Sequence, residues 1–266
     1  MKEKIVFKDS EGNRVVGILS DPSGDSSVPI IICAHGSTSN KDRATYTGME
    51  ERLNKAGFSS FRFDFFAHGE SQGEYEDLTV TRAVDDILSA IRLLKDNGYS
   101  KIGLFGCSFG GISSIMAASK TDDLFCLALK CPVSSYQDKY DQELSETELQ
   151  GWKEKGFRIK KKPDGREFRI NYSFYENIDK NDGYKAAERI NIPTFIVHGS
   201  ADKTVPVEQS KNICSMIHDC KLEIIEGADH RFSGSGHFAR MMQLVSGFLI
   251  DQCKKQQRST NNMHED

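Results

Sequence analysis

Three short stretches of this chain carry residue types that together could transfer an acyl group. The first is GCSFG (106–110), which follows the apolar run KIGLF and opens a helical pattern. That context is typical of a nucleophile elbow, in which a tight strand-to-helix turn presents a serine hydroxyl above the sheet. Small residues on either side of the serine let the strand and the helix approach each other. We therefore predict Ser108 as a nucleophile; the alternative is a sharp turn with no catalytic role.

A serine hydroxyl needs a base whose pKa lies near the working pH, and this requirement favours histidine. Of the seven histidines, His230 closes the stretch GADH (227–230) just after the last predicted strand. That position would bring it to the same edge of the sheet as Ser108, so we predict His230 as the base rather than as a structural loop histidine. His198 ends a strand in front of a glycine, and we expect it to have a packed structural role.

An imidazole that acts as a base needs a carboxylate to hold its tautomer and to stabilise the imidazolium. Asp202 comes directly after the predicted strand 192–199 and is our candidate. The alternatives are Asp229, which neighbours His230 in the chain, and a purely structural role for Asp202 in the turn before Pro206.

Acyl transfer also develops an oxyanion, which needs N–H donors placed in advance. One donor would be the backbone N–H of Phe109, directly after the nucleophile. The second would come from Ser37, because Gly36 permits a close turn after the third predicted strand. We expect His35, in the same loop, and His68, in the loop after the fourth strand, to fix these loops rather than to touch substrate.

The elements that must position these residues are visible as apolar runs. Eight runs rich in Val, Ile and Phe predict strands at 4–8, 14–20, 28–34, 58–64, 101–106, 125–131, 192–199 and 220–227. Helical patterns separate the later runs, so we predict an α/β fold with an eight-stranded, mostly parallel sheet and helices on both faces. The first two runs are joined by the polar turn DSEGN and predict an antiparallel hairpin at one edge.

Helices are predicted from apolar positions that recur with a period of 3.6 residues. This pattern predicts a helix from Val80 to Leu94, which Asp77 or Thr79 can cap and Gly98 can end. The same pattern predicts three further helices: directly after GCSFG, near 206–218, and through 238–249.

One segment, residues 133–185, breaks the alternation of strand and helix. Its acidic stretch DQELSETELQ suits a short helix, and FRIKK-KPDG-REFRI predicts a hairpin around a Pro-Asp-Gly turn. We interpret the segment as a cap insertion after the sixth strand, lying over the carboxyl edge of the sheet. The core domain would then comprise residues 1–132 and 186–256, followed by a flexible tail at 257–266.

Aromatic side chains of the insertion could line a substrate pocket beneath it, or could simply pack the insertion onto the sheet. The aromatic residues concerned are Trp152, Phe157, Phe168, Tyr172, Phe174 and Tyr175, of which Trp152, Phe174 and Tyr175 are our pocket candidates. We expect the basic run Lys160–Lys162 to be a solvated hairpin tip.

Composition argues against several classes of protein. The 266 residues are 28% charged and 38% hydrophobic with a formal net charge of −4, which is typical of a globular protein without the basic field that attracts nucleic acid or an anionic membrane. The N-terminal stretch does not read as a signal peptide, and no apolar run is long enough to span a membrane. We expect a cytoplasmic protein that needs no metal or cofactor, and the sequence leaves a homodimer open.

The seven cysteines are scattered, and no CxxC pair occurs, so zinc and redox sites lack support. We expect mostly buried thiols, as is usual in a reducing cytoplasm. Disulfides within Cys126–Cys131 or Cys214–Cys220 are not expected.

These motifs together resemble the α/β-hydrolase superfamily. More narrowly, they are similar to the small bacterial cinnamoyl and feruloyl esterases and to related lysophospholipase-like hydrolases. The stretches that carry the resemblance are HGSTSNKD (35–42), FDFFAHGESQGEYEDLTV (63–80), GCSFGG (106–111), HGSADKTVPVEQS (198–210) and GADHRF (227–232).

The resemblance implies a triad of Ser108, Asp202 and His230, in the chain order of that superfamily. It also implies oxyanion donors on Ser37 and Phe109. The chain departs from those esterases at Ser37, where they usually carry an aromatic residue. It departs again at Cys107 and Phe109, where they usually carry His or Tyr and Gln. These departures leave the chemistry intact but weaken specificity for hydroxycinnamate.

We therefore predict a carboxylic ester hydrolase acting on small to medium acyl or aryl esters, with hydroxycinnamoyl esters among them. One alternative is a serine peptidase or acylaminoacyl hydrolase, although the propeller domain common in such peptidases has no room in 266 residues. Another is a catalytically silent binding module with the same fold, which the complete Ser, Asp and His set disfavours.

Overall fold

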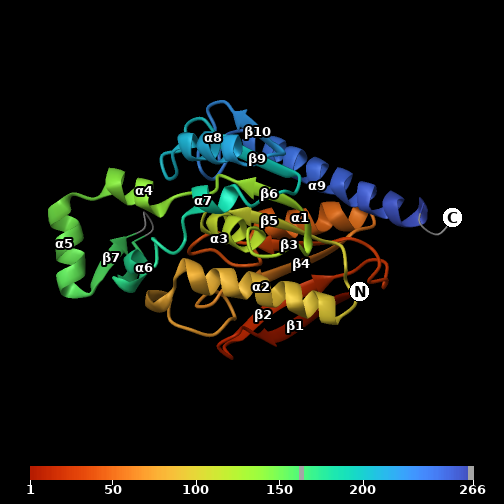
Figure 1. Ribbon diagram of the computed structural model, residues 1–266, viewed down its shortest axis with the longest axis horizontal. Helices are drawn as coiled ribbons and strands as arrows, with labels where there is room; N and C mark the ends of the chain where they lie inside the picture. Colours follow the sequence, from red (N-terminus) through yellow and green to blue (C-terminus); the bar gives the residue numbers. More distant parts are fainter. Residues whose placement is uncertain (162–164, 263–266) are drawn as a thin grey trace.

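A central sheet forms the core of the molecule and ends in the loops that hold the candidate residues (Figure 1). The computed structural model describes residues 1–161 and 165–262. Within these residues, eight strands form one sheet in the order β1-β2-β4-β3-β5-β6-β9-β10. Their bounds are β1 Lys2–Lys8, β2 Arg14–Ser20, β3 Ile30–Ala34, β4 Ser59–Asp64, β5 Ile102–Cys107, β6 Leu124–Lys130, β9 Thr194–Gly199 and β10 Cys220–Ile225.

The direction of the strands agrees with the sequence pattern. β1 and β2 form an antiparallel hairpin at one edge, and β2 pairs antiparallel with β4. The pairs from β4 through β3, β5, β6 and β9 to β10 are all parallel. The predicted eight-stranded, mostly parallel sheet and its edge hairpin are therefore confirmed.

Helices cover both faces of the sheet, because alternate residues of each central strand point to opposite sides. In β3, Ile30 and Ile32 enter one core, while Ile31 and Cys33 enter the other. The first core is covered by α2 Val80–Asp96, α3 Phe109–Ala118, α7 Gly183–Ala187 and α8 Val207–Met216. The second is covered by α1 Ala44–Lys55 and α9 His237–Asn262.

Local signals set the ends of the predicted helices. Thr79 caps α2 by accepting a hydrogen bond from the backbone N–H of Arg82, and Gly98 follows the helix with a φ of +89°. The last helix is longer than expected. It continues to Asn262, so residues 257–262, which we expected to be part of a flexible tail, are helical, and residues 263–266 lie outside the described residues.

The carboxyl ends of the parallel strands meet at one edge of the sheet. Ala34 is in register with Gly106, Cys107 with Lys130, and Lys130 with Val197. The loops that follow β3, β5, β9 and β10 therefore emerge side by side, although they are far apart in sequence. This register brings the three chemical stretches together.

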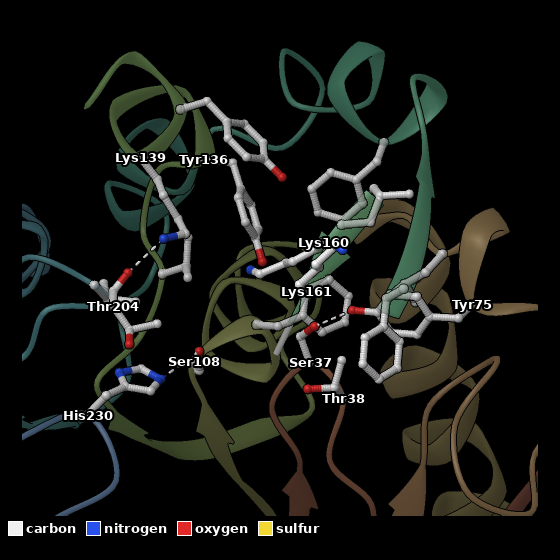
Figure 2. Close-up of a pocket in the computed structure, with 18 of the residues that line it drawn as sticks. Ser37, Thr38, Tyr75, Ser108, Tyr136, Lys139, Lys160, Lys161, Thr204 and His230 are labelled. Atoms are coloured by element: carbon white, nitrogen blue, oxygen red, sulfur yellow. Dashed lines mark hydrogen bonds between the residues drawn. The ribbon is translucent and has the colours of Figure 1, made fainter. Parts of the chain in front are cut away.

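The 133–185 segment leaves the sheet after β6 and projects from its end, at the left of Figure 1. It contains α4 Tyr136–Glu143, α5 Glu146–Lys155, β7 Phe157–Lys161, β8 Glu167–Asn171, α6 Ser173–Glu176 and α7. The predicted hairpin is present as the antiparallel pair β7-β8, and residues 162–164 of its turn lie outside the described residues. Side chains of this segment and of the strand-end loops line one common pocket (Figure 2).

Several hydrogen bonds hold the segment to the core, and two sets of them show how. At its base, the Gln209 side chain accepts from the backbone N–H of Ser134 and donates to the backbone carbonyl of Ser135. At the hairpin, Asn171 donates to Asp77 in the short 3-10 helix η1 Tyr75–Asp77. The hairpin is therefore tied to the rim of the sheet as well as to its own segment.

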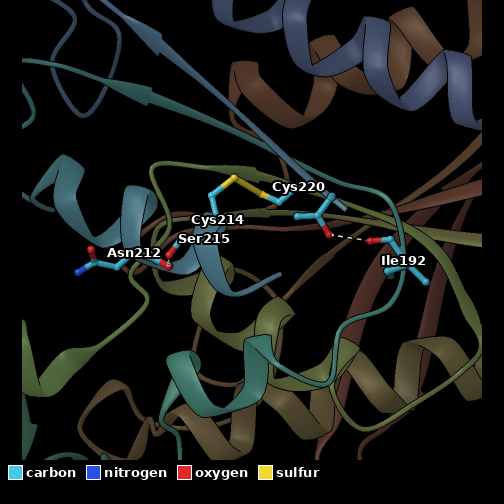
Figure 3. The surroundings of a disulfide bond; sticks show 6 residues. Ile192, Asn212, Cys214, Ser215 and Cys220 are labelled. Atoms are coloured by element: carbon cyan, nitrogen blue, oxygen red, sulfur yellow. Dashed lines mark hydrogen bonds between the residues drawn. A yellow bond between two sulfur atoms is a disulfide. The ribbon is translucent and has the colours of Figure 1, made fainter. Parts of the chain in front are cut away.

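The expectation that Cys214 and Cys220 do not form a disulfide is wrong. Cys214 in α8 and Cys220 at the start of β10 form a disulfide, with Cα atoms 5.4 Å apart (Figure 3). The short connection between helix and strand brings the two side chains together. The other cysteines, which are Cys33, Cys107, Cys126, Cys131 and Cys253, are free and buried as expected.

In the part of the chain that the structure describes, no helix has the length and apolar composition needed to cross a membrane.

Candidate active site

Ser108 stands in the turn between β5 and α3 in a backbone conformation that few L-residues adopt. Its φ is +54° and its ψ is −113°. Such strain is tolerated where the surrounding structure enforces it, and it is a feature of nucleophile elbows. Gly110 is required here, since a Cβ at this position would lie 2.4 Å from the backbone oxygen of Ala34. The elbow predicted from GCSFG is therefore present.

The structure brings Ser108, His230 and Asp202 into hydrogen-bond contact (Figure 2 shows the first two). The Oγ of Ser108 lies 3.1 Å from Nε2 of His230, and Nδ1 of His230 lies 2.6 Å from Oδ2 of Asp202. An ionised carboxylate only accepts hydrogen bonds, so Nδ1 carries the proton and Nε2 is left to accept from the serine. The rival carboxylate Asp229 instead accepts from the backbone and side chain of Ser233.

The Asp202 carboxylate is held as an anion. Oδ1 accepts from the backbone N–H groups of Thr204 and Val205, and Oδ2 lies 3.2 Å from Nε2 of His198. Burial alone would raise the pKa of Asp202, but the hydrogen bonds from His198 and His230 outweigh it and hold that pKa well below its usual range.

His198 was expected only to pack, and its contact with Asp202 is a finding that the sequence did not predict. The imidazole is fully buried, with Nδ1 against the hydroxyl of Ser210 and Nε2 3.0 Å from the carbonyl of Val205. A carbonyl accepts, so Nε2 carries a proton that Asp202 shares. The only prior signal was its place at a strand end, four residues before Asp202.

The same residues are the candidates for a metal site, together with a cysteine. Ligand atoms of Cys131, His198 and Asp202 lie within 4.8 Å of one another. However, the His198 nitrogens and both Asp202 oxygens already have the hydrogen-bond partners just described, which leaves little capacity for an ion. We assign these groups to the support of His230 and propose no metal there.

The imidazole of His230 is held in its neutral form. Burial lowers its pKa, the hydrogen bond to Asp202 opposes this shift, and the charge of Lys130 adds to it. Lys130 lies close because its Nζ donates to the backbone carbonyl of His230 at 2.6 Å, while sitting 5.1 Å from the centre of the Phe232 ring. A base with a lowered pKa stays unprotonated into mildly acidic solution.

The two predicted oxyanion donors lie beside the nucleophile and line the same pocket. Neither the backbone N–H of Ser37 nor that of Phe109 donates to another group among the described residues. A Cβ on Gly36 would lie 3.4 Å from Cβ of Ser108, which shows how closely this loop approaches the elbow. Both N–H groups are thus available to an oxygen bound next to Ser108.

Two histidines fix the loop that carries Ser37. His35 is buried, its Nε2 accepts from the backbone N–H of Phe65, and its Nδ1 lies 2.8 Å from the carbonyl of Gly36. His68 accepts from the backbone N–H of Thr38 at 3.2 Å. Both side chains therefore have the loop-fixing contacts that we expected.

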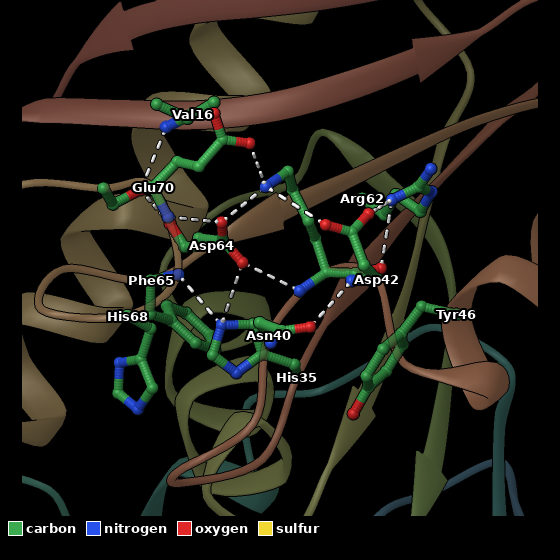
Figure 4. A network of polar contacts seen from close by, with 12 residues as sticks. Val16, His35, Asn40, Asp42, Tyr46, Arg62, Asp64, Phe65, His68 and Glu70 are labelled. Atoms are coloured by element: carbon green, nitrogen blue, oxygen red, sulfur yellow. Dashed lines mark hydrogen bonds and ion pairs between the residues drawn. The ribbon is translucent and has the colours of Figure 1, made fainter.

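A buried ionic network anchors the far end of this loop (Figure 4). Asp64, at the end of β4, accepts from the backbone N–H of Lys41 at 2.8 Å and from its ammonium at 2.7 Å. The same ammonium lies 2.8 Å from Glu70, whose backbone N–H donates to Asp64. Lys41 and Asp64 are 2% and 0% exposed, so the ion pair is shielded from water and holds the two loops at fixed separation.

The pocket above Ser108 has a volume of about 440 Å³ and is enclosed on one side by the 133–185 segment. Of the three predicted lining residues, Phe174 faces this pocket. Trp152 and Tyr175 do not. Trp152 is 2% exposed and donates through Nε1 to the carbonyl of Ile170, and its ring centre lies 5.8 Å from that of Tyr175. These two rings pack with Tyr140 and Tyr172 in the interior of the segment.

Lys160 and Lys161 are exposed, as we expected of a hairpin tip, but they also border the pocket. Strand alternation could have indicated this for Lys160, which pairs with Phe168 on one face of the hairpin, but not for Lys161, which is the next residue on the strand. Lys162 lies outside the described residues.

The fold, together with the contacts of His230 with Ser108 on one side and Asp202 on the other, defines an α/β-hydrolase. Residues 72–256 match the prolyl oligopeptidase family, and the chain belongs to that family. The superfamily inferred from the sequence motifs is therefore confirmed.

Known proteins of this fold cover nearly the whole chain. Est1E from Butyrivibrio proteoclasticus, solved with ferulic acid bound, superposes with a TM-score of 0.82 and 24% identity, over 93% of this chain and 98% of that one. The mitochondrial palmitoyl-protein thioesterase ABHD10 of Mus musculus is 28% identical over 211 residues, which are 76% of this chain and 69% of the mouse protein. The solved mouse ABHD10 structure superposes with a TM-score of 0.75 and 21% identity, over 93% of this chain and 98% of its own.

Proposed function

We propose that this protein is a serine hydrolase that cleaves carboxylic esters with small to medium acyl or aryl groups. The observation that carries the proposal is the hydrogen-bonded series from Ser108 Oγ through His230 to Asp202, with spacings of 3.1 and 2.6 Å. A nucleophile, a base within reach and a group that orients the base are the parts required for covalent acyl transfer.

In the first step, Ser108 Oγ attacks the ester carbonyl carbon while its proton passes to Nε2 of His230. The carbonyl electron pair moves to its oxygen, which the N–H groups of Ser37 and Phe109 would stabilise. The bond from carbon to the alcohol oxygen then breaks, and His230 gives its proton to the departing alcohol. Water, deprotonated by His230, attacks the acyl-serine and releases the acid, which restores Ser108.

The test combines a covalent probe with an activity assay. A fluorophosphonate should label Ser108, and p-nitrophenyl butyrate should be turned over. Ser108→Ala should lose labelling and at least about 10⁴-fold in kcat. Ser119→Ala, at the end of the same helix, is the matched control and should retain both properties. Full esterase activity in Ser108→Ala would rule out this mechanism, and an unlabelled but folded wild-type protein would favour a silent binding module.

A second candidate function is amide hydrolysis, which the match to the prolyl oligopeptidase family favours. The same triad serves amides, but the leaving amine is poorer than an alcohol. We propose that esters are preferred. The comparison is kcat/KM on p-nitrophenyl esters against aminoacyl p-nitroanilides, and a preference for the anilides would reverse the assignment.

A short panel of esters and one thioester can identify the acyl group that the protein prefers. Est1E was solved with ferulic acid and the mouse relative is named as a palmitoyl-protein thioesterase. Methyl ferulate, acyl esters of increasing length and a palmitoyl thioester would therefore test hydroxycinnamoyl and long-chain substrates. We further propose that residues 133–185 act as a cap whose side chains set this choice, since Tyr136, Phe168 and Phe174 line the pocket.

We also propose that the protein is located in the cytoplasm and does not bind nucleic acid. Five buried free cysteines support the location, and the Cys214–Cys220 disulfide argues against it. The protein would be isolated from the cells that produce it naturally and alkylated with and without prior reduction. The comparison would show whether Cys214 and Cys220 are thiols or a disulfide there. Analytical ultracentrifugation would show whether the protein forms a homodimer.

A further inference from the structure

The pocket above Ser108 is unusually cationic for a protein of net negative charge. Its described lining includes Lys139, Lys160, Lys161 and Arg231 and no aspartate or glutamate, whereas the whole chain has a formal charge of −4. Cations that gather at a cleft raise the local concentration of anionic ligands. A cation that is not already paired with a carboxylate is free to bind such a ligand.

Two of the four already have carboxylate partners. Lys139 pairs with Glu143 and also donates to the carbonyl of Thr204 at 2.7 Å. Lys161 lies 2.7 Å from Glu167 on the neighbouring strand and is 74% exposed. Arg231 is exposed at the rim of the pocket.

Lys160 is also exposed, but it differs from Lys139 and Lys161 in pairing and from Lys161 in the face of the strand on which it lies. It pairs with Phe168 across the β7-β8 hairpin, so it projects on the same face as Phe168 and Ile170, which both line the pocket. Figure 2 shows it between Tyr136 and Ser37, on the far side of the pocket from His230. Among the described residues, no carboxylate lies within ion-pair distance of its ammonium.

The surroundings of Lys160 hold a surplus of positive charge. Lys160 is exposed to solvent along its length, but desolvation by the protein around its ammonium lowers its pKa, and the charges of Lys139 and Arg158 add to the shift against the opposing charge of Glu143. The guanidinium of Arg158 lies over the rings of Trp152 and Tyr140, and its Nη1 is buried with no hydrogen-bond partner among the described groups. An anion bound here would relieve this repulsion.

A neutral hydrogen-bond donor stands beside the lysine. The hydroxyl of Tyr136 lines the pocket and has no hydrogen-bond partner among the described residues. Burial holds the pKa of Tyr136 well above its usual value, so the group stays a donor. An ammonium and a phenol hydroxyl are suited to bind one carboxylate or phosphate.

We propose that this pocket takes esters whose acyl or alcohol part ends in an anionic group, a carboxylate or a phosphate, and that Lys160 and Tyr136 bind that group. The inference rests on the proposed esterase function and specifies its substrate class. Ser108 would attack the ester carbonyl at one end of the pocket while Lys160 holds the charged end of the substrate at the other.

Matched esters that differ in one charged group test this proposal. Mono-p-nitrophenyl glutarate is compared with p-nitrophenyl pentanoate for an anion on the acyl side. p-Acetoxybenzoate and p-acetoxyphenyl phosphate are compared with p-tolyl acetate for an anion on the alcohol side, and these two arms separate carboxylate from phosphate. Each kcat/KM is divided by the rate of alkaline hydrolysis of the same ester, which removes differences in intrinsic reactivity.

For at least one anionic ester we expect a normalised kcat/KM about ten-fold or more above that of its neutral partner. Lys160→Met should lower this ratio by about ten-fold, and Lys160→Arg should keep most of it. Tyr136→Phe, which preserves the ring, should lower it a few-fold. Lys161→Met is the matched neighbour on the same strand, and it should lower the ratio far less because Lys161 is already paired with Glu167.

Equal or better turnover of the neutral esters at low salt would overturn the proposal. An equal fall of the ratio in Lys160→Met and Lys161→Met would overturn the role of Lys160. Loss of turnover on every ester, with no fluorophosphonate label on Ser108, would instead refute the esterase function itself.

Discussion

Nε2 of His198 lies 3.2 Å from Oδ2 of Asp202, the same oxygen that Nδ1 of His230 approaches to 2.6 Å. Two imidazoles thus share one carboxylate oxygen, one facing Ser108 and the other facing the protein interior. His198 is itself held by Ser210 and by the carbonyl of Val205. We interpret it as a positioning residue that fixes the direction of the Asp202 carboxylate.

His198→Gln should lower kcat about ten-fold with little change in KM. A hydrogen bond to a charged group contributes about 1.5–3 kcal/mol, and about 1.4 kcal/mol corresponds to a factor of ten. Electrostatic interaction with His198 contributes to the lowered pKa of His230, so in His198→Gln the acidic limb of the kcat/KM profile should move to higher pH.

Ser210→Ala serves as the control for His198→Gln, because it removes a contact of His198 but leaves Asp202 untouched. It should retain most of the activity. An unchanged pH profile and kcat in His198→Gln would show that the second imidazole only fills space.

The acidic limb of the pH profile reports the protonation of His230. Burial and the charge of Lys130 lower the pKa of His230. The activity of the wild-type protein should therefore be lost only at a pH below about 6.5, the ordinary pKa of histidine. Lys130→Met removes the charge and keeps the length of the side chain. Protonation of His230 then becomes easier, and the limb should move to higher pH by a few tenths of a unit.

This shift is read from kcat/KM measured on p-nitrophenyl butyrate across the acidic range. Lys221→Met, at an exposed lysine paired with Glu223, should leave the limb in place. A limb that moves to lower pH in Lys130→Met would contradict the sign of the electrostatic effect.

Asp86 in α2 should weaken the fold as pH rises. It is fully buried, one oxygen accepts from the backbone N–H of Phe66 at 2.7 Å, and the other has no partner among the described groups. Burial raises the pKa of Asp86 to about 8. An unfolded aspartic acid ionises near 3.9, so the folded state binds the extra proton and stability falls between pH of about 4 and about 8.

Asp86→Asn keeps the acceptor for Phe66 and removes the titration. The gain in Tm over wild type should be at least about 3 °C larger at pH 8 than at pH 5, since 1 kcal/mol corresponds to about 2–4 °C in a chain of this size. Thermal melts of Asp86→Asn and of Asp85→Asn, an acidic neighbour on the same helix, are compared. A gain that does not depend on pH would show that the buried carboxyl is ionised in the folded state.

Local pattern was sufficient for most of the fold. All eight strands of the central sheet fall within a few residues of the apolar runs, and α2 begins after its predicted cap Thr79. Where the local pattern gave a wrong prediction, the cause was a contact that forms only in the folded chain. The tail from residue 257 has nothing obvious to bury, yet α9 continues to Asn262. Cys214 and Cys220 pair because a helix and a strand meet there.

The candidate site divides in the same way. Ser108, Asp202 and His230 could be chosen because each follows a strand, and parallel strands end at one edge. No comparable rule predicts which side chains of the 133–185 segment face the pocket. Trp152 and Tyr175 were candidates for the pocket, but they pack within their own segment, which was the alternative. Lys160 is exposed, as expected, yet it also borders the pocket.

The sequence by itself determined the positions of the strands along the chain, the elbow at Ser108 and the residue types of the three chemical stretches. These follow from periodicity and turn chemistry, which act over a few neighbouring residues. Only the tertiary structure decided which side chains meet across that edge: His198 on Asp202, Lys41 on Asp64, and Lys160 in the pocket. Such contacts depend on how segments far apart in the chain pack together, and no local pattern encodes that packing.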